Sequence, residues 1–244
     1  MKIGIYHTLG DFGLKNSFSI FKHLLKANVD LLEIGLPFSD PLLDGVIIQE
    51  SHKRALNSNL SWYEICTALN DLKKYCNHEQ KISIMTTTQL LYTEERRASF
   101  PKFSGLLFSD LNYNKKLPFE ISTPRVWFLT PEIVLNTENL VPPEKFSMIY
   151  LTRVQGVTGN SKELNISTQK AIAKLKAKFS TDIWLGFGIS HKDHILEAKE
   201  IGANGVIIGS AFIDYLDKTL SKTKISDYVI QSAIEKFLLL LNIS

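Results

Sequence analysis

Short apolar segments recur along the chain and alternate with longer amphipathic segments. The apolar segments are four to six residues long, are rich in Ile, Val and Leu, and end close to Gly, Pro or polar residues. This pattern is typical of buried strands. It predicts eight strands, at residues 3–7, 29–34, 82–86, 105–108, 126–129, 148–151, 183–186 and 205–208.

The segments between these strands place apolar residues three or four positions apart, as the buried face of a helix requires. Helices are predicted most clearly at residues 18–26, 61–75, 168–179 and 193–201, with a long packing helix at 225–241. Strands that alternate with helices predict a parallel sheet. Eight such units in 244 residues favour a closed (β/α)8 TIM barrel over an open doubly wound sheet. No Gly/Ser-rich or Pro-rich linker divides the chain, so we expect a single α/β domain over residues 1–244.

A carboxylate interrupts the second predicted strand. Glu33 lies in the apolar run 29–34, and Asp44 follows in the next loop. A carboxylate in an apolar strand must be paired, be solvated at the strand end, or have a shifted pKa. Two carboxylates in different surroundings can divide the acid and base roles of a reaction. The spacing alone favours a structural role, in which Glu33 accepts from a backbone amide and Asp40 or Asp44 caps a turn or a helix.

The two acids belong to a longer motif. Residues 33–45 read EIGLPFSDPLLDG, and Ile48 and Gln49 follow. This run closely resembles the signature of the tryptophan synthase alpha chain family, which has the pattern ELGxPFSDPxADGPxIQ. Further blocks match in the same order at residues 8–11, 156–159, 186–190 and 208–211. The resemblance therefore spans nearly the whole chain.

The resemblance implies a reaction and a set of residues. The family cleaves indole-3-glycerol phosphate to indole and glyceraldehyde 3-phosphate in tryptophan biosynthesis. By resemblance, Glu33 is the general acid/base that moves protons at C3 of the indole and at the glycerol hydroxyl, and Asp44 accepts from the indole N–H. The substrate-binding residues implied in the same way are Tyr6, Ile48, Tyr150, Thr158 and Phe187.

Two glycine-containing loops predict where the phosphate of the substrate binds. Gly188 follows the seventh predicted strand, and Gly209 and Ser210 follow the eighth at the start of a helix. Glycines let backbone amides approach an anion, and a helix N-terminus offers N–H groups. The loops after strands seven and eight are the recurrent phosphate position of TIM barrels. Tight turns that need a positive φ are the alternative explanation of these glycines.

A polar loop bracketed by glycines lies after the sixth predicted strand. Residues 156–160 are suited to closing over a substrate and excluding water, although an ordinary flexible connection has the same composition. The family closes this loop through a Thr, here Thr158, onto the Asp equivalent to Asp44. By resemblance, Gly159 adds an amide to the phosphate site.

Some positions depart from the family pattern. In the third strand, Thr87 stands where the family usually has an aromatic residue, and Gln89 where it has Asn. We also expect the barrel to lack the N-terminal helix that the family has at the barrel floor, since the first predicted strand begins at residue 3. Loss of aromatic packing on the substrate can lower catalysis without abolishing the fold. A second hypothesis is therefore a catalytically weak or inactive alpha chain that acts mainly as an allosteric activator of the beta chain.

The resemblance also implies a partner. Alpha chains assemble with a beta chain that carries pyridoxal phosphate, so we expect an alpha2beta2 heterotetramer and no cofactor in this chain. No metal is expected either. His191 and His194 share one face of a helix start, but no third ligand is spaced to complete a site.

Composition narrows the remaining function classes. The formal net charge is only +3 and no basic block is interleaved with aromatics, so we expect no nucleic-acid partner. No run is long and apolar enough for a signal peptide or a membrane span, which makes the cytoplasm the expected location. Cys66 and Cys76 are the only cysteines, and we interpret both as structural thiols.

Overall fold

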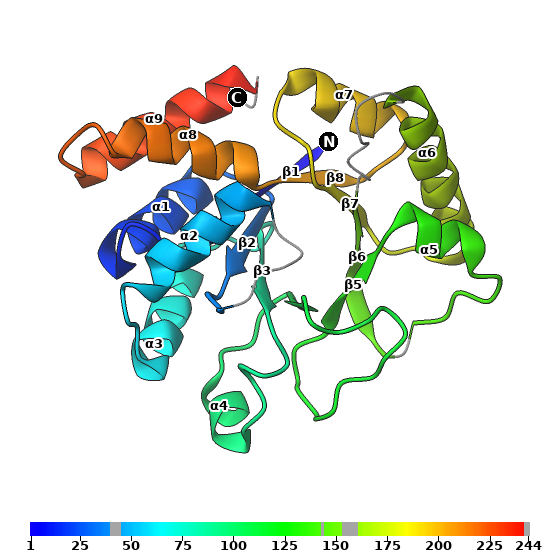
Figure 1. Cartoon of the computed structure of the whole chain (residues 1–244), viewed down its shortest axis with the longest axis horizontal. Helices are drawn as coiled ribbons and strands as arrows, with labels where there is room; N and C mark the ends of the chain where they lie inside the picture. The colour runs from blue at the N-terminus through cyan, green and yellow to red at the C-terminus, as the bar shows by residue number, and fades with distance from the viewer. Residues whose placement is uncertain (40–44, 143, 153–160, 242–244) are drawn as a thin grey trace.

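Eight parallel strands close into a barrel in the computed structural model (Figure 1), which describes residues 1–39, 45–142, 144–152 and 161–241. Each strand pairs with the next along the chain, and the eighth pairs with the first. The strands are β1 (Lys2–Thr8), β2 (Leu31–Gly35), β3 (Lys81–Thr86), β4 (Gly105–Phe108), β5 (Arg125–Leu129), β6 (Phe146–Thr152), β7 (Ile183–Gly186) and β8 (Gly205–Ile208). The closed barrel predicted from the alternating pattern is confirmed, and each predicted strand end is correct to within two residues.

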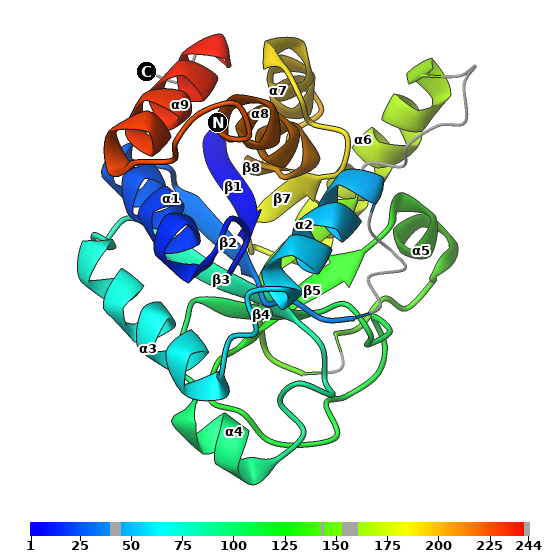
Figure 2. The same cartoon turned by 60° about the vertical axis from the view of Figure 1, so that its left-hand side comes forward.

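Helices surround the outside of the barrel (Figures 1 and 2). They are α1 (Leu14–Lys26), α2 (Val46–Leu56), α3 (Trp62–Leu72), α4 (Glu94–Ser99), α5 (Pro131–Asn136), α6 (Ser161–Lys178), α7 (Lys192–Glu200), α8 (Ser210–Leu220) and α9 (Asp227–Leu240). A 3-10 turn, η1 (Lys73–Tyr75), extends α3. Among the described residues, no helix is long and apolar enough to cross a membrane.

The helical ring differs from the sequence prediction at several elements, of which α6, the connection between β4 and β5, and α2 are three. The helix predicted at 168–179 begins seven residues earlier, at Ser161. Residues 109–124, between β4 and β5, contain no helix. In Figure 1 this irregular segment lies between α4 and α5 on the outside of the barrel. Asn and Pro residues in this connection disfavour helix, which explains the break in the strand–helix alternation.

The third difference is α2, which hydrophobic periodicity did not predict. Its buried residues are Ser51, His52 and Ala55, so the face that packs against the barrel is mostly polar. A helix with such a face has no apolar stripe to detect. The polar groups on α2 instead contact the carboxyl end of β1, where the candidate site lies.

The core has two layers, as the barrel architecture requires. Outward-facing strand residues pack against the helices, whereas inward-facing residues fill the barrel itself. The inner layer includes Leu31, Val126, Met148, Trp184 and Ile207. These side chains fill the interior of the barrel.

Candidate active site

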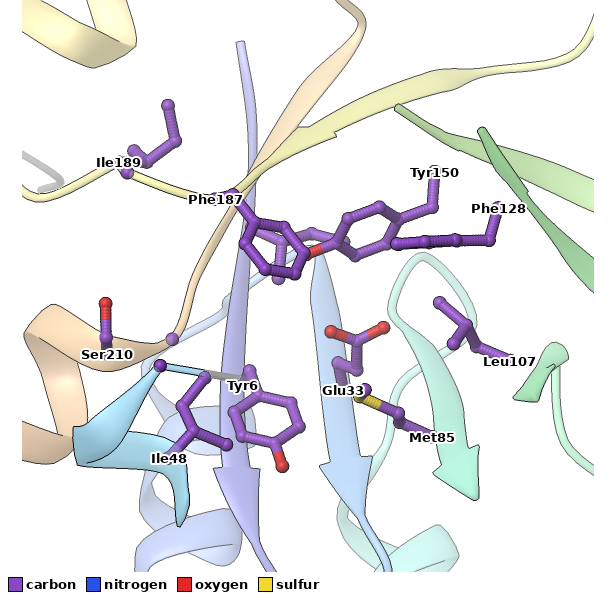
Figure 3. A pocket seen from close by; sticks show the side chains of 14 residues that line it. Tyr6, Glu33, Ile48, Met85, Leu107, Phe128, Tyr150, Phe187, Ile189 and Ser210 are labelled. Carbon is purple, nitrogen blue, oxygen red and sulfur yellow. The ribbon is translucent and has the colours of Figure 1, made fainter. Parts of the chain in front are cut away.

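A cavity of about 300 Å³ opens among the carboxyl ends of the strands (Figure 3). It is small for a ligand pocket but large enough for a compact aromatic molecule. The lining residues are Tyr6, Glu33, Gly45, Ile48, Met85, Leu107, Phe128, Tyr150, Phe187, Gly188, Ile189, Ile207, Gly209 and Ser210. Most of these side chains are apolar, and the polar side-chain groups are those of Tyr6, Glu33, Tyr150 and Ser210.

Glu33 supplies the only carboxylate among the described lining residues. It lies in the middle of β2, where its Cα is in register with Tyr6 of β1 and Ser83 of β3. Alternation along the strand turns its side chain into the barrel, and Figure 3 shows the carboxylate directed into the cavity. The residue is only 2% exposed. A buried carboxylate facing an otherwise apolar cavity is suited to proton transfer.

Three aromatic rings form one wall of the cavity. The ring centroids of Phe128 and Tyr150 are 5.5 Å apart, and the ring of Phe187 lies 6.3 Å from that of Tyr150 and 6.4 Å from that of Phe128. Tyr150 leans over Gly186, where any Cβ would overlap its hydroxyl. Phe187 has a φ of 66°, a left-handed conformation that non-glycine residues seldom adopt. Such strain is common at binding sites, where it aims a side chain at the ligand.

The third strand contributes little to this cavity. Met85 lines it, but Thr87 and Gln89 are not among its described lining residues. Thr88 donates its backbone N–H and its hydroxyl to the Asp110 carboxylate, at 2.8 and 2.6 Å, which ties the segment after β3 to the loop after β4. The wall formed by the rings of Phe128, Tyr150 and Phe187 comes from β5, β6 and the end of β7, on the opposite side of the barrel from β3.

The two glycine loops meet at one end of the cavity. Gly188 has a φ of 73°, so its turn requires glycine. Gly209 is the N-cap of α8, and its carbonyl accepts from the amides of Phe212 and Ile213. The amides at the very start of a helix, here beginning with Ser210, have no intrahelical partner and carry partial positive charge. The arrangement can bind an anion at this end of the cavity.

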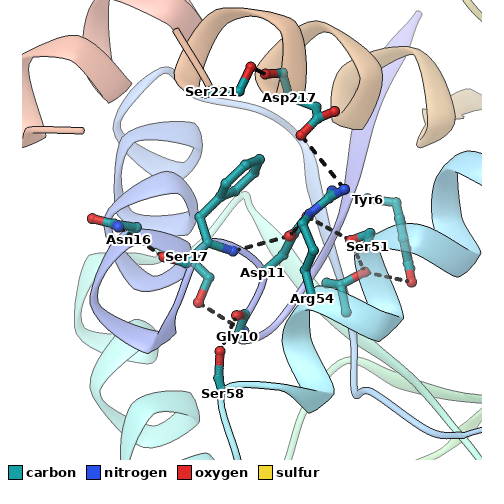
Figure 4. Close-up of polar contacts among 12 residues, drawn as sticks. Tyr6, Gly10, Asp11, Asn16, Ser17, Ser51, Arg54, Ser58, Asp217 and Ser221 are labelled. Carbon is teal, nitrogen blue, oxygen red and sulfur yellow. Dashed lines mark hydrogen bonds and ion pairs between the residues drawn. The ribbon is translucent and has the colours of Figure 1, made fainter. Parts of the chain in front are cut away.

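A buried ion pair anchors α2 beside the cavity (Figure 4). The Asp11 carboxylate, which is fully buried, accepts from Nε of Arg54 at 2.6 Å and from its Nη2 at 3.0 Å. Ser51 lies within hydrogen-bond distance of both Asp11 and Thr8. Arg54 also approaches Asp217 of α8 at 3.6 Å. These directed contacts fix α2 against the end of β1.

The structure brings most of the predicted site residues to this one cavity. Those that line it are Tyr6, Glu33, Ile48, Tyr150, Phe187, Gly188, Gly209 and Ser210. Asp40, Asp44, Thr158 and Gly159 lie outside the described residues, although Asp44 directly precedes Gly45, a lining residue. The cavity is also lined by residues that were not predicted from the sequence, namely Gly45, Met85, Leu107, Phe128, Ile189 and Ile207.

The histidines and cysteines lie elsewhere. His191 and His194 lie close together at the start of α7, with ring centroids 3.8 Å apart and ring planes 38° apart. No group of three or more His, Cys, Asp or Glu side chains suited to a metal occurs in the described part of the chain. Burial raises the pKa of both thiols, Cys66 and Cys76, which lowers their reactivity.

Comparison with known proteins decides the family. Residues 3–237 match the model of the tryptophan synthase alpha chain family. The tryptophan synthase alpha chain of Helicobacter pylori is 33% identical over 224 residues, which cover 88% of this chain and 85% of that protein. The chain belongs to the tryptophan synthase alpha chain family. The alpha chain of Prochlorococcus marinus is 32% identical over 212 residues, which cover 84% and 79% of the two chains.

Solved structures of alpha chains share the barrel. A Pyrococcus furiosus structure, described as that of a tryptophan synthase a2b2 complex, has a TM-score of 0.76 at 24% identity and covers 99% of this chain and 98% of that one. Tryptophan synthase subunit alpha from Campylobacter jejuni has a TM-score of 0.75 at 18% identity and covers 97% and 95%. Identities this low show the fold alone. Membership of the alpha chain family itself implies a lyase role in tryptophan synthesis.

Proposed function

We propose that this alpha chain cleaves indole-3-glycerol phosphate to indole and glyceraldehyde 3-phosphate, with Glu33 as the general acid/base. The observation that supports this proposal most directly is the position of the Glu33 carboxylate. It faces a cavity that has an aromatic wall on one side and the N-terminus of α8 at one end. The substrate needs three features in its site: an aromatic wall for the indole ring, a proton-handling group and a site for the phosphate.

The cavity suits the two ends of this substrate. The indole ring packs against the rings of Phe128, Tyr150 and Phe187, because aromatic pairs are favourable beyond their buried area. The phosphate binds at the amides near Gly188 and Ser210, where the α8 dipole favours an anion. The glycerol carbon attached to the indole then lies over the middle of the cavity, within reach of Glu33.

Glu33 moves two protons in the reaction that we propose. Protonation of indole C3 places positive charge on the ring. Removal of the proton from the adjacent glycerol hydroxyl forms the aldehyde carbonyl, and the electrons of the breaking C–C bond restore the indole. Asp44 accepts from the indole N–H and stabilises the positive charge. General acid/base catalysis of this kind is worth about 10²–10⁴ in rate.

We also propose that the chain works with a tryptophan synthase beta chain in an alpha2beta2 assembly, as in the Pyrococcus furiosus complex. Pyridoxal phosphate would be carried by the beta chain, and Thr158 and Gly159 would act in this chain's own closure and phosphate binding. Nothing in the comparisons favours the hypothesis of a catalytically weak activator chain. Sedimentation of the mixed chains, with tryptophan formation from indole and serine, tests the partner.

Replacing Glu33 with Gln tests the reaction. The change keeps the shape and the hydrogen-bonding capacity of the side chain but removes its titration, so indole release should fall about 100-fold or more. Glycerol phosphate binding should be unchanged, because the anion site lies elsewhere in the cavity. Glu50→Gln, on the exposed part of α2, is the matched control. Activity of the Glu33 variant within tenfold of the wild type would refute the assignment.

A further inference from the structure

His52 connects two parts of the candidate site that are far apart along the chain. It lies on the buried face of α2 and is only 1% exposed. Its Nε2 is 3.1 Å from the hydroxyl of Tyr6, a cavity-lining residue. Its Nδ1 accepts from the backbone N–H of Phe38 at 3.3 Å, and the two rings meet edge to face with centroids 4.8 Å apart.

The two hydrogen bonds fix the tautomer of the imidazole. A backbone N–H can only donate, so Nδ1 must carry no proton. The proton of the neutral ring is therefore on Nε2, which donates it to the Tyr6 oxygen. Burial lowers the pKa of His52 to about 4, although the nearby Asp11 carboxylate acts in the opposite direction. The ring is thus neutral at pH 7 and makes both bonds.

The positions of its partners give His52 a specific role. Tyr6 forms the cavity wall next to Glu33, because the two residues are in register on adjacent strands. Phe38 stands two residues before the segment 40–44, and Gly45, directly after it, is the N-cap of α2. His52 therefore holds the backbone just after β2 to α2, the next helix along the chain.

We propose that His52 is a positioning residue of the lyase, which holds Tyr6 against the substrate through Nε2 and, through Nδ1, the backbone at Phe38 that continues the Glu33 strand. The inference rests on the proposed function, since it assigns the two hydrogen bonds to two different parts of that reaction. Loss of the bond to Tyr6 loosens the cavity wall and weakens substrate binding. Loss of the bond to Phe38 loosens the backbone just after β2, the strand of Glu33, and slows the chemical step.

Two substitutions separate the bonds. The Asn carbonyl in His52→Asn stands where Nδ1 was, so it keeps the acceptor for Phe38 and loses the donor to Tyr6. The Gln amide in His52→Gln reaches the position of Nε2, so it keeps the donor and loses the acceptor. A single hydrogen bond of this kind is worth about 0.5–1.5 kcal/mol, so effects of about three- to tenfold are expected. His23→Asn, a buried histidine on α1 that pairs with Asp227, is the matched control.

Steady-state kinetics give the decisive measurement. We expect His52→Asn to raise KM with kcat within about twofold, and His52→Gln to lower kcat with KM within about twofold. Tyr6→Phe should reproduce the effect of His52→Asn, and combining the two should add nothing further, because both remove the same bond. The His23 control should alter stability without altering either constant.

Other results overturn the proposal. If both His52 variants change activity only in proportion to the folded fraction, or change KM and kcat alike, His52 has a purely structural role. Calorimetry with an uncleavable compound that joins an indole to a phosphate by a three-carbon chain distinguishes this failure from that of the proposed function. A wild-type chain that binds this compound but releases no indole refutes the lyase, whereas equal affinity of wild type and His52→Asn refutes the positioning role.

Discussion

The buried imidazole of His7 should make the stability of the barrel depend on pH. It is fully buried on β1, and its ring centroid lies 5.6 Å from that of Phe21, 5.9 Å from Phe212 and 6.3 Å from Phe12. Neither ring nitrogen has a hydrogen-bond partner among the described residues. Burial lowers the pKa of His7 from 6.5 to about 4, because the charged form loses its hydration.

The pKa difference makes stability depend on pH. The unfolded chain binds a proton at His7 near pH 6.5, whereas the native chain binds it only near pH 4. Stability due to this group is therefore present above pH 6.5 and is lost as the pH falls toward 4. Between pH 7 and pH 5 the loss is about 2 kcal/mol. His52, with a similarly lowered pKa, adds its own loss over the same range.

His7→Leu removes this titration while leaving that of His52 in place. Urea unfolding followed by circular dichroism at pH 7 and pH 5 gives the free energy of unfolding of both proteins. The free energy of unfolding of the variant, relative to that of the wild type, should be about 2 kcal/mol higher at pH 5 than at pH 7. His52 titrates alike in both proteins, so its effect cancels in this difference. His7→Phe, which keeps a ring in contact with the three phenylalanines, should show the same shift. Parallel loss of stability in wild type and variants would refute the reasoning.

Two further substitutions test the supports of the site. Arg54→Met leaves the buried Asp11 carboxylate without its cation. It should lower the free energy of unfolding, measured by urea titration, by about 3 kcal/mol. A loss below about 1 kcal/mol would mean that the ion pair does not stabilise the fold. Ser210→Asp places a carboxylate at the N-terminus of α8 and should weaken glycerol phosphate binding about three- to tenfold by calorimetry. Unchanged affinity would move the phosphate site elsewhere.

The strands could be predicted from sequence because a parallel barrel buries both faces of each strand. Short continuous apolar runs such as 105–108, 183–186 and 205–208 therefore mark β4, β7 and β8 with their correct ends. The helices were predicted less well, since their signal depends on one apolar face. The connection 109–124 has no such face and no helix, and α2 is a helix without the signal.

Within the site, some residues could be identified from sequence motifs, whereas others are identified only from the structure. Glu33 and Gly188 stand in motifs that are continuous along the chain, so sequence comparison finds them. Phe128 belongs to no motif, and its side chain enters the cavity only because β5 starts in a register that turns Val126 and Phe128 inward. That direction is a property of the closed sheet. A local pattern of five residues cannot specify it.

The polar face of α2 accounts both for its absence from the prediction and for its place beside the site. Apolar contacts are not directional, so a helix held by them alone can rotate or slide slightly at little cost. The paired bonds from Arg54 to Asp11 and the two bonds of His52 are directional, and each permits one orientation of the helix. Buried polar groups of this kind add little net stability compared with apolar residues of similar size. Their contribution here is to fix where Gly45, the N-cap of α2, meets the cavity, which a catalytic site needs more than it needs stability.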